Sequence, residues 1–190
     1  MTKDELRERT RRRLSGIPPA VRAAAERAIA ERVWTVPEVA GARCLLLFAH
    51  LPEEVSTDPI AEEALRRGIA LAYPRTLPQG RVMTLHRVRG LDELTPGRYG
   101  IREPDRGRCP EVTLEEIDAA LVPGLAWDRR GGRLGRGAGY FDRLFGDPGW
   151  WGFRCGIFFS FQEAISIPTD PWDVPLQAVV TEREVWRASS

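Results

Sequence analysis

The chain has 190 residues, of which 43% are hydrophobic and 29% are charged. These values are ordinary for a globular protein, and the length favours a single domain over residues 1–190. A formal net charge of +1 gives no support for a surface field that attracts nucleic acid or an anionic membrane. The N-terminus is charged and lacks the apolar stretch of a signal peptide, and the three cysteines lack zinc-binding spacing, so we expect a cytoplasmic protein with reduced thiols.

The first predicted elements are two helices. Thr2 and Glu5 form a capping box that opens the first helix, and Gly16 ends it. The second helix begins at Pro18 and Pro19, because proline is tolerated in the first turn of a helix. Acidic residues interrupt the basic face of the first helix, so we interpret that face as solvated rather than as an RNA-binding stripe.

Strands and helices alternate along the rest of the chain. Short apolar runs predict buried strands at residues 43–50, 69–74, 118–123, 153–160 and 178–182. Alternating polarity predicts an outer or antiparallel strand at 82–88, and helices are expected at 58–68 and 140–145. Residues 89–110 are rich in Gly, Pro and Arg and are expected to form a surface loop. This order predicts an α/β fold with a mixed, mostly parallel sheet and helices on both faces.

The stretch GGRLGRGAGYFDRLF, residues 131–145, contains five glycines in its first nine positions. Glycine loses much backbone entropy on folding, so such a cluster usually has a steric reason. The stretch follows the strand at 118–123, and ligands of open α/β sheets bind beyond the carboxyl ends of strands. Its backbone N–H groups can approach a phosphate, and Arg133 and Arg136 can add charged donors. Asp142 can hold a Mg²⁺ that bridges phosphates.

The glycine stretch matches neither of the common phosphate-binding fingerprints. It lacks the G-K-[S/T] of a P-loop, and its spacing is not G-x-G-x-x-G. From the residues alone, a tight strand-to-helix turn with solvated arginines is an equal alternative.

Segments spread over most of the chain resemble one known family. They are KDELR (3–7), YPR (73–75), YGIREP (99–104), LVPGLAWDRRGGRLGRGAGYFDRLF (121–145), FSFQ (159–162) and IPTDPWDVPLQAVVTE (167–182). In this order they resemble the 5-formyltetrahydrofolate cyclo-ligase family, also called methenyltetrahydrofolate synthetase. The segment at 121–145 is similar to the family's V-P-G, aromatic-Asp pair and R-L-G-x-G-x-G-Y-Y-D.

The resemblance implies an ATP-dependent reaction. In the family, the formyl oxygen of 5-formyltetrahydrofolate attacks the γ-phosphate of MgATP, N10 closes onto the activated formyl carbon, and phosphate leaves. The products are 5,10-methenyltetrahydrofolate, ADP and phosphate. Phosphoryl transfer depends mostly on positioning and charge neutralisation, so backbone donors, arginine, lysine and Mg²⁺ suit it.

The resemblance also implies which residues bind the nucleotide. The ATP-binding loop consists of Arg133, Leu134, Gly135, Arg136, Gly137, Ala138, Gly139, Tyr140 and Phe141. Arg136 and Asp142 are the implied catalytic residues, and Asp142 and Asp173 are the implied magnesium ligands. Lys3 and Arg7 contact the phosphates, and their spacing of four places them on one face of the first helix.

Lys3 is the only lysine among 28 basic residues. Lysine acts on phosphate as a point charge and arginine as a wide fork, so an ammonium at this position indicates that a guanidinium does not serve. A chance lysine on a frayed chain terminus is the alternative.

For the folate, the resemblance implies substrate contacts by Ala49, Glu54 and Tyr99. The Glu54 carboxylate can accept hydrogen bonds from pterin N–H groups, and its neighbour Glu53 can be confused with it. Tyr99 can stack on the folate, although a tyrosine in a folded protein often only packs.

Four residues depart from the family pattern. Ala138 stands where many relatives have glycine or lysine, and Phe141 replaces the second tyrosine of the pattern. Thr76 stands where some relatives have an aromatic residue, and Gln177 stands where an aspartate is common. The nucleotide loop therefore matches the family better than the folate side does.

Two other functions stay open. One is a divergent family member that binds MgATP and acts on a different acceptor. The other is a nucleic-acid-binding module, whose affinity would fall steeply with salt and which the near-neutral charge disfavours. We expect a monomer that uses 5-formyltetrahydrofolate, ATP and Mg²⁺, with no nucleic acid or membrane partner.

Overall fold

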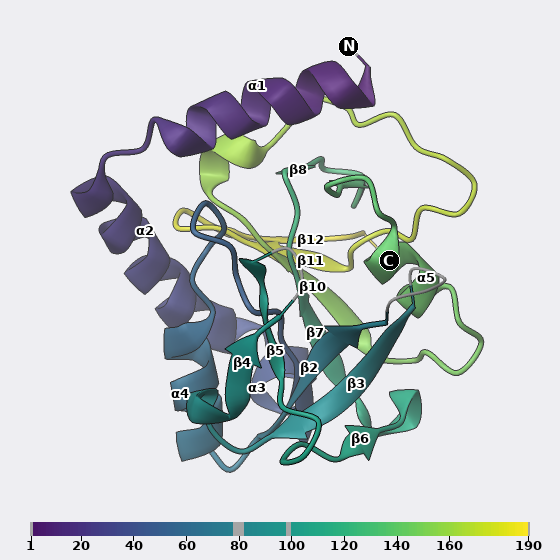
Figure 1. The fold of residues 1–190 in the computed structure, drawn as a ribbon. Helices are drawn as coiled ribbons and strands as arrows, with labels where there is room; N and C mark the ends of the chain where they lie inside the picture. Colours follow the sequence, from purple (N-terminus) through teal and green to yellow (C-terminus); the bar gives the residue numbers. More distant parts are fainter. Residues whose placement is uncertain (1, 78–81, 98–99, 190) are drawn as a thin grey trace.

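The computed structural model describes residues 2–77, 82–97 and 100–189. Its centre is an eight-stranded sheet with the order β12-β11-β10-β7-β1-β2-β3-β6 (Figure 1). The strands are β1 (Cys44–Leu46), β2 (Ala70–Thr76), β3 (Met83–Val88), β6 (Glu111–Val112), β7 (Ala119–Val122), β10 (Phe153–Ile157), β11 (Ala178–Val180) and β12 (Val185–Arg187). The five strands from β11 to β2 pair in parallel, and β3, β6 and β12 add antiparallel pairs. The predicted mixed, mostly parallel sheet is confirmed.

Alternate residues of the central strands point to opposite faces of the sheet, and both faces are buried. Leu45 and Leu47 join one core cluster, whereas Leu46 joins the other. A strand that is covered on both faces needs apolar residues at every position. This is why β1 is a continuous apolar run in the sequence.

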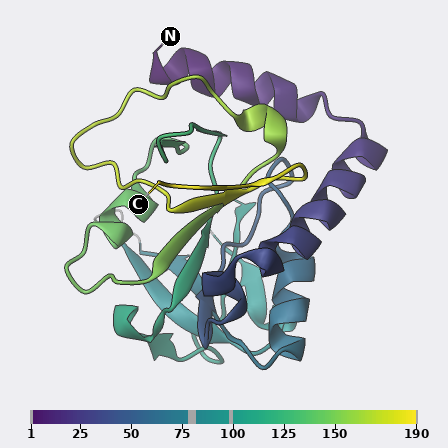
Figure 2. The same cartoon turned by 180° about the vertical axis from the view of Figure 1, so that it is seen from behind.

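Helices cover the two faces unequally. One face packs against α2 (Pro19–Arg32), α3 (Pro37–Ala40) and α4 (Asp58–Arg66), which lie together in Figure 2. The other face packs against α5 (Tyr140–Phe145) and against apolar side chains from loops, including Trp150. Helices on both faces are confirmed, although α5 is short. Short 3₁₀ helices occupy Val33–Thr35, Leu91–Glu93, Leu114–Glu116 and Ser160–Gln162.

Helix α1 (Lys3–Ser15) lies beyond the carboxyl ends of the parallel strands, at the top of Figure 1. It opens with the predicted capping box, in which Thr2 Oγ1 accepts a hydrogen bond from Glu5 N and the Glu5 carboxylate accepts one from Thr2 N. Leu6 is buried against Ala126, Leu134 and Ile167. The helix is therefore docked on the body of the protein and is not a frayed terminus.

The prediction of a surface loop at 89–110 is wrong in part. β4 (Leu94–Pro96) and β5 (Arg102–Pro104) form an antiparallel pair, and β5 packs beside β2. Leu94 and Glu103 are buried there. The proline that ends each short strand interrupts the polarity pattern, so the segment gives no strand signal. A second small pair, β8 (Ala126–Trp127) with β9 (Arg133–Leu134), was likewise not predicted.

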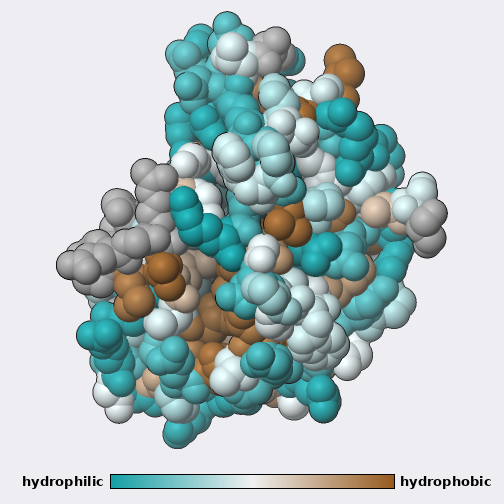
Figure 3. All heavy atoms as spheres, turned by 90° about the vertical axis from the view of Figure 1, so that its right-hand side faces the viewer, coloured by the Kyte–Doolittle hydropathy of each residue, from teal (hydrophilic) through white to brown (hydrophobic). Residues whose placement is uncertain are grey.

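Polar and apolar residues are distributed unevenly over the surface. On the side shown in Figure 3, hydrophilic residues cover the upper part of the molecule and apolar residues gather lower down around a hollow. Within the described residues, no helix is both long and apolar enough to span a membrane. Cys44, Cys109 and Cys155 are buried and free.

Candidate active site

The glycine loop, residues 131–139, follows the carboxyl end of β7 and leads into α5. Gly131, Gly137 and Gly139 have φ angles of 81°, 111° and 69°. These angles lie in the left-handed region, where a residue with a Cβ atom is strained. The glycines therefore have the steric reason that the sequence predicts.

The glycine loop lies between two cavities. On one side is a cleft of about 910 Å³ rich in charged residues, which we call the polar cleft. On the other side is a smaller cavity of about 160 Å³ with mostly aliphatic and aromatic walls, which we call the apolar cavity. The residues that line both are Arg133, Gly135, Ala138, Gly139 and Asp142. The loop and the start of α5 thus form a wall shared by the two cavities.

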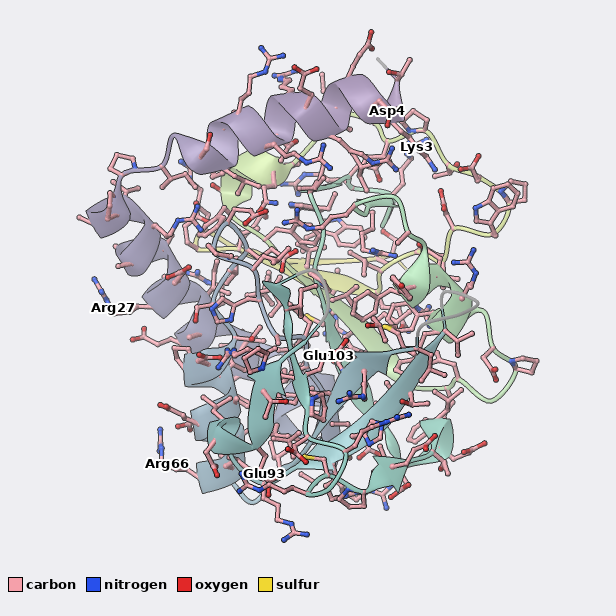
Figure 4. The ribbon with its side chains drawn as sticks, viewed as in Figure 1. Lys3, Asp4, Arg27, Arg66, Glu93 and Glu103 are labelled. Carbon is pink, nitrogen blue, oxygen red and sulfur yellow. The ribbon has the colours of Figure 1, made fainter. Side chains whose placement is uncertain are left out.

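The Lys3 ammonium lies in the polar cleft between two carboxylates, Asp170 and Asp173. Figure 4 labels Lys3 at the start of α1. Lys3 Nζ is 2.6 Å from Asp170 Oδ2 and 2.8 Å from Asp173 Oδ2. Burial lowers the pKa of Lys3, but the hydrogen bonds to both carboxylates outweigh it and leave the pKa raised. Burial raises the pKa of Asp173, and the hydrogen bonds from Lys3 and Asp170 N outweigh it and leave the pKa lowered. The ion pair is therefore charged on both sides at neutral pH.

Arg7 joins α1 to the glycine loop. Its Nε donates a hydrogen bond to Gly135 O at 3.1 Å, and its Nη1 pairs with Asp4 Oδ1 at 2.5 Å. A Cβ atom on Gly137 would lie 3.9 Å from the Arg7 guanidinium. Lys3 and Arg7 both line the polar cleft, so they lie on one face of the helix, as their spacing predicts.

An ion pair between Arg133 and Asp142 stands in the shared wall. Arg133 Nη2 is 2.8 Å from Asp142 Oδ1, and the two side chains are only 4% and 18% exposed. Val174 N also donates to Asp142 Oδ1, at 3.4 Å. Arg133 Nε is buried and has no hydrogen-bond partner among the described residues. A buried donor without a partner destabilises a protein by about 1–3 kcal/mol, so this position favours an additional acceptor.

The two carboxylates predicted to hold Mg²⁺, Asp142 and Asp173, both line the polar cleft. In the structure, Asp142 is paired with Arg133 and Asp173 is paired with Lys3. The described residues contain no group of three or more His, Cys, Asp or Glu side chains suited to a metal. Mg²⁺ usually binds one or two carboxylates and completes its shell with water and phosphate oxygens. The donor set therefore fits a Mg²⁺ that is bound together with a nucleotide.

The apolar cavity contains Ala49 and Glu54, as predicted for the folate side. Its other walls include Phe48, Leu51, Pro74, Met83 and Ile101. Glu54 Oε2 accepts a hydrogen bond from Leu51 N, and Glu54 Oε1 accepts one from Arg136 Nε, both at 3.0 Å. Arg136 Nη2 also pairs with Glu53 Oε1 at 2.8 Å. Arg136 thus faces Glu53 and Glu54, of which Glu54 lines the apolar cavity, whereas the sequence predicts Arg136 among the phosphate-binding residues.

The remaining predicted residues fall in different places. Leu134 lines the polar cleft, and Tyr140 and Phe141 line the apolar cavity. Tyr99 lies outside the described residues. Gln177 Oε1 accepts a hydrogen bond from Arg154 N at the start of β10, so its amide is used within the sheet.

Sequence reasoning missed several residues that shape the site. Asp170 holds Lys3, Glu103 lines the apolar cavity, and Gln162 donates from Nε2 to the carbonyls of Gly124 and Leu125 at 3.1 Å. All three lie in segments that resemble the family, but nothing in the local pattern sets them apart.

Asp128 fixes the turn before the glycine loop. The fully buried carboxylate accepts hydrogen bonds from the backbone N–H groups of Arg130, Gly132 and Ile167. Burial raises the pKa of Asp128, but these bonds and the one from the Arg130 side chain outweigh it and leave the pKa lowered. A Cβ atom on Gly132 would come within 2.8 Å of Asp128 Oδ1, so the carboxylate needs glycine there.

Comparison with known proteins agrees with this geometry. The sequence model of the 5-formyltetrahydrofolate cyclo-ligase family matches residues 1–182. The chain belongs to this family. The family member of Escherichia coli K12, a 5-formyltetrahydrofolate cyclo-ligase, is 31% identical over 162 residues, which cover 83% of this chain and 87% of the relative.

Solved structures of the family have the same fold. The NMR structure of Aquifex aeolicus 5,10-methenyltetrahydrofolate synthetase has a TM-score of 0.86 and 32% identity, covering 100% of this chain and 94% of that one. A synthetase of the same name from Mycoplasma pneumoniae has a TM-score of 0.78 at 20% identity, covering 96% of this chain and 100% of the other, which supports the fold. The family resemblance in the sequence is confirmed.

Proposed function

We propose that the chain catalyses the reaction of its family, the ATP-dependent conversion of 5-formyltetrahydrofolate to 5,10-methenyltetrahydrofolate with release of ADP and phosphate. The observation that carries the proposal is the wall shared by the two cavities. The polar cleft suits a triphosphate, and the apolar cavity suits a flat ring system. Because the reaction passes a phosphoryl group from one substrate to the other, the two substrates must meet, and the shared wall is where they can.

On the nucleotide side, we assign phosphate binding to the backbone of residues 133–141 with Lys3 and Arg7. Lys3 exchanges its Asp173 partner for phosphate oxygens when ATP binds. Asp142 and Asp173 would hold Mg²⁺, which neutralises charge on the phosphates when it is bound. Asp170 remains close to Lys3 and keeps the ammonium oriented toward the cleft.

Two arginines near the wall shared by the two cavities have different partners. Arg133 is buried in the wall by Asp142 and offers its unpaired Nε to an acceptor. Arg136 is held on the other side by Glu53 and Glu54. We assign to Arg136 the catalytic contact with the phosphoryl group as it reaches the formyl oxygen, because charged donors stabilise phosphoryl transfer.

On the folate side, Ala49 and Glu54 contact the substrate, and Glu54 accepts hydrogen bonds from pterin N–H groups. The aliphatic walls exclude water from the phosphorylated formyl group, so that N10 rather than water attacks it. Tyr99 as a stacking partner stays a prediction. So do the monomeric state, the cytoplasmic location and the absence of nucleic acid and membrane partners.

The test is an assay of the purified protein with 5-formyltetrahydrofolate, ATP and Mg²⁺. The near-ultraviolet absorbance of the methenyl product and the release of ADP are followed together, with ATP and Mg²⁺ omitted in turn. We expect product only when both are present, with ADP in equal amount. Binding of MgATP by calorimetry without any product would instead indicate a family member that acts on another acceptor.

A further inference from the structure

A second carboxylate, from Glu103, faces the apolar cavity from β5. Glu103 is only 5% exposed, and it lines the cavity together with Thr76 and Ile101. Figure 4 labels it near the middle of the view, and it belongs to β5. Burying a carboxylate is unfavourable unless its oxygens accept hydrogen bonds, so the partners of Glu103 indicate what it is for.

The two oxygens of Glu103 are used differently. Oε1 accepts hydrogen bonds from both the backbone N and the hydroxyl of Thr76. Oε2 accepts none from the described residues, and it is not among the fully enclosed polar atoms that lack a partner. The nearby Arg102 does not supply one, because its guanidinium pairs with Asp58 at 2.6 Å. Among the described residues, Oε2 is therefore the Glu103 oxygen left without a donor, on a side chain that lines the cavity.

The backbone around Glu103 fixes this orientation. Glu103 pairs with Thr95 in the β4–β5 ladder. A Cβ atom on Gly97 would come within 2.5 Å of Glu103 Cγ and 2.8 Å of its Cδ, so the side chain occupies space that only glycine leaves free. With Thr76 on one side and Gly97 on the other, the carboxylate has little freedom to turn.

Glu54, the other glutamate of the cavity, differs in this respect. Each of its oxygens already accepts a hydrogen bond, one from Leu51 N and one from Arg136 Nε. Among the described residues, the glutamate oxygen that lines this cavity without a partner is therefore on Glu103. Glu54 lies with Arg136 at the reacting end, whereas Glu103 lies on β5 with Thr76.

We propose that Glu103 recognises the 2-amino-4-oxo end of the pterin ring and that its Oε2 accepts a hydrogen bond from the 2-amino group. A charged oxygen makes a stronger hydrogen bond to such an N–H donor than a neutral acceptor does. Thr76, where the family pattern has an aromatic residue, acts as the positioning residue for this carboxylate. The inference rests on the proposed function, since it names how that substrate is oriented.

The experiment measures binding of 5-formyltetrahydrofolate by calorimetry to the wild type and to Glu103→Gln. The variant keeps an acceptor for Thr76 but turns an N–H₂ group toward the ring donors, so we expect about 10- to 100-fold weaker binding. The matched control is Glu93→Gln, which alters a buried glutamate outside both cavities, where it accepts from Arg89 N at 2.9 Å. We expect this control to bind within about twofold of the wild type.

A second ligand makes the test specific for the amino group. The 2-desamino-2-methyl analogue of the substrate should bind the wild type about 10- to 100-fold more weakly than the parent, and Glu103→Gln should discriminate less than about threefold. Equal binding of the parent by Glu103→Gln and the wild type, or unchanged discrimination, would overturn the inference. A wild type that binds no 5-formyltetrahydrofolate would instead overturn the proposed function as well.

Thermal unfolding of each variant shows whether it folds. Should Glu103→Gln not fold, Thr76→Val keeps the carboxylate and removes only the hydroxyl that orients it. We expect about 3- to 10-fold weaker binding of the parent with discrimination against the analogue retained. Unchanged affinity in Thr76→Val would then contradict the inference.

Discussion

The polar cleft and the apolar cavity share one wall but satisfy their polar groups in different ways. In the cleft, Lys3 is paired with Asp170 and Asp173, which lie at the other end of the chain. In the cavity, the carboxylate of Glu54 accepts from the backbone of Leu51, three residues away. In the cleft, Lys3 is thus held by two charged partners, whereas in the cavity Glu54 is held by one local backbone donor and one charged partner, Arg136.

This difference has a consequence for the two substrates. A nucleotide must displace existing ion pairs, so its affinity reflects an exchange of partners rather than a simple attraction of opposite charges. A folate meets polar groups that are already oriented, so its recognition depends on preset geometry. Substitutions in the cleft should therefore change the kinetic constants for ATP, and substitutions in the cavity should change those for the folate. Substitutions in the shared wall should change the rate of the chemical step.

The largest effect is expected in the shared wall, from Asp142→Asn. The variant removes a proposed metal ligand and the charge partner of Arg133, so we expect kcat to fall by at least about 100-fold, while circular dichroism should show that the fold persists. Asp147→Asn, an exposed carboxylate outside both cavities, is the control and should keep full activity. Wild-type turnover in Asp142→Asn would refute the metal role.

The next effect is in the polar cleft, from Lys3→Arg. The ammonium fits between two carboxylate oxygens at 2.6 and 2.8 Å, and a guanidinium is a wider fork that cannot take the same position. We expect kcat/KM for ATP to fall about 10-fold with an unchanged KM for the folate. Arg9→Lys, at an exposed position of α1, should change neither value. A KM effect on the folate alone would contradict the separation of the two cavities.

For the apolar cavity, Glu53 and Glu54 offer a matched pair of substitutions. Both side chains pair with Arg136, but only Glu54 lines the cavity. Glu54→Gln should raise the KM for 5-formyltetrahydrofolate about 10-fold, and Glu53→Gln less than about twofold. Steady-state kinetics at saturating ATP measures both. Equal effects would mean that the two residues act only by anchoring Arg136.

The smallest effect on turnover is expected for Asp128→Asn. Asp128 is buried outside both cavities and fixes the turn before the shared wall. We expect kcat within about twofold of wild type, and unfolding free energy lower by about 1–3 kcal/mol at pH 7. The pKa of Asp128 is lowered in the folded state, so its contribution is present above the unfolded pKa and is lost as pH falls through the folded pKa. Urea unfolding should show the stabilities of the two proteins converging as the pH falls below the ordinary aspartate pKa of about 3.9; a difference that stays constant with pH would contradict this.

The sequence predicts the polar cleft better than the apolar cavity for a physical reason. The glycine loop is contiguous, so its spacing is visible, and it places several cleft residues at once. The ion pairs of Lys3 span 167 and 170 residues, so no local pattern shows them; the family resemblance indicates Asp173 but not Asp170. Among the sheet strands, the long apolar runs were predictable because burial on both faces demands them.

The cavity was less predictable because it is built by the segment that gives no clear pattern. Glu103 lies in β5, within residues expected to form a loop, and its role depends on Thr76 and Gly97, which come from two other segments. The orientation of Arg136 toward Glu53 and Glu54 is also set by tertiary contacts that spacing cannot reveal.

The central claim is that the formyl oxygen, held in the apolar cavity, receives the γ-phosphoryl group from the polar cleft across the glycine loop. The most direct measurement uses 5-formyltetrahydrofolate labelled with ¹⁸O in the formyl group and analyses the released phosphate by mass spectrometry. We predict that each phosphate carries one labelled oxygen. Unlabelled phosphate, with the label found in water, would contradict direct transfer between the two cavities.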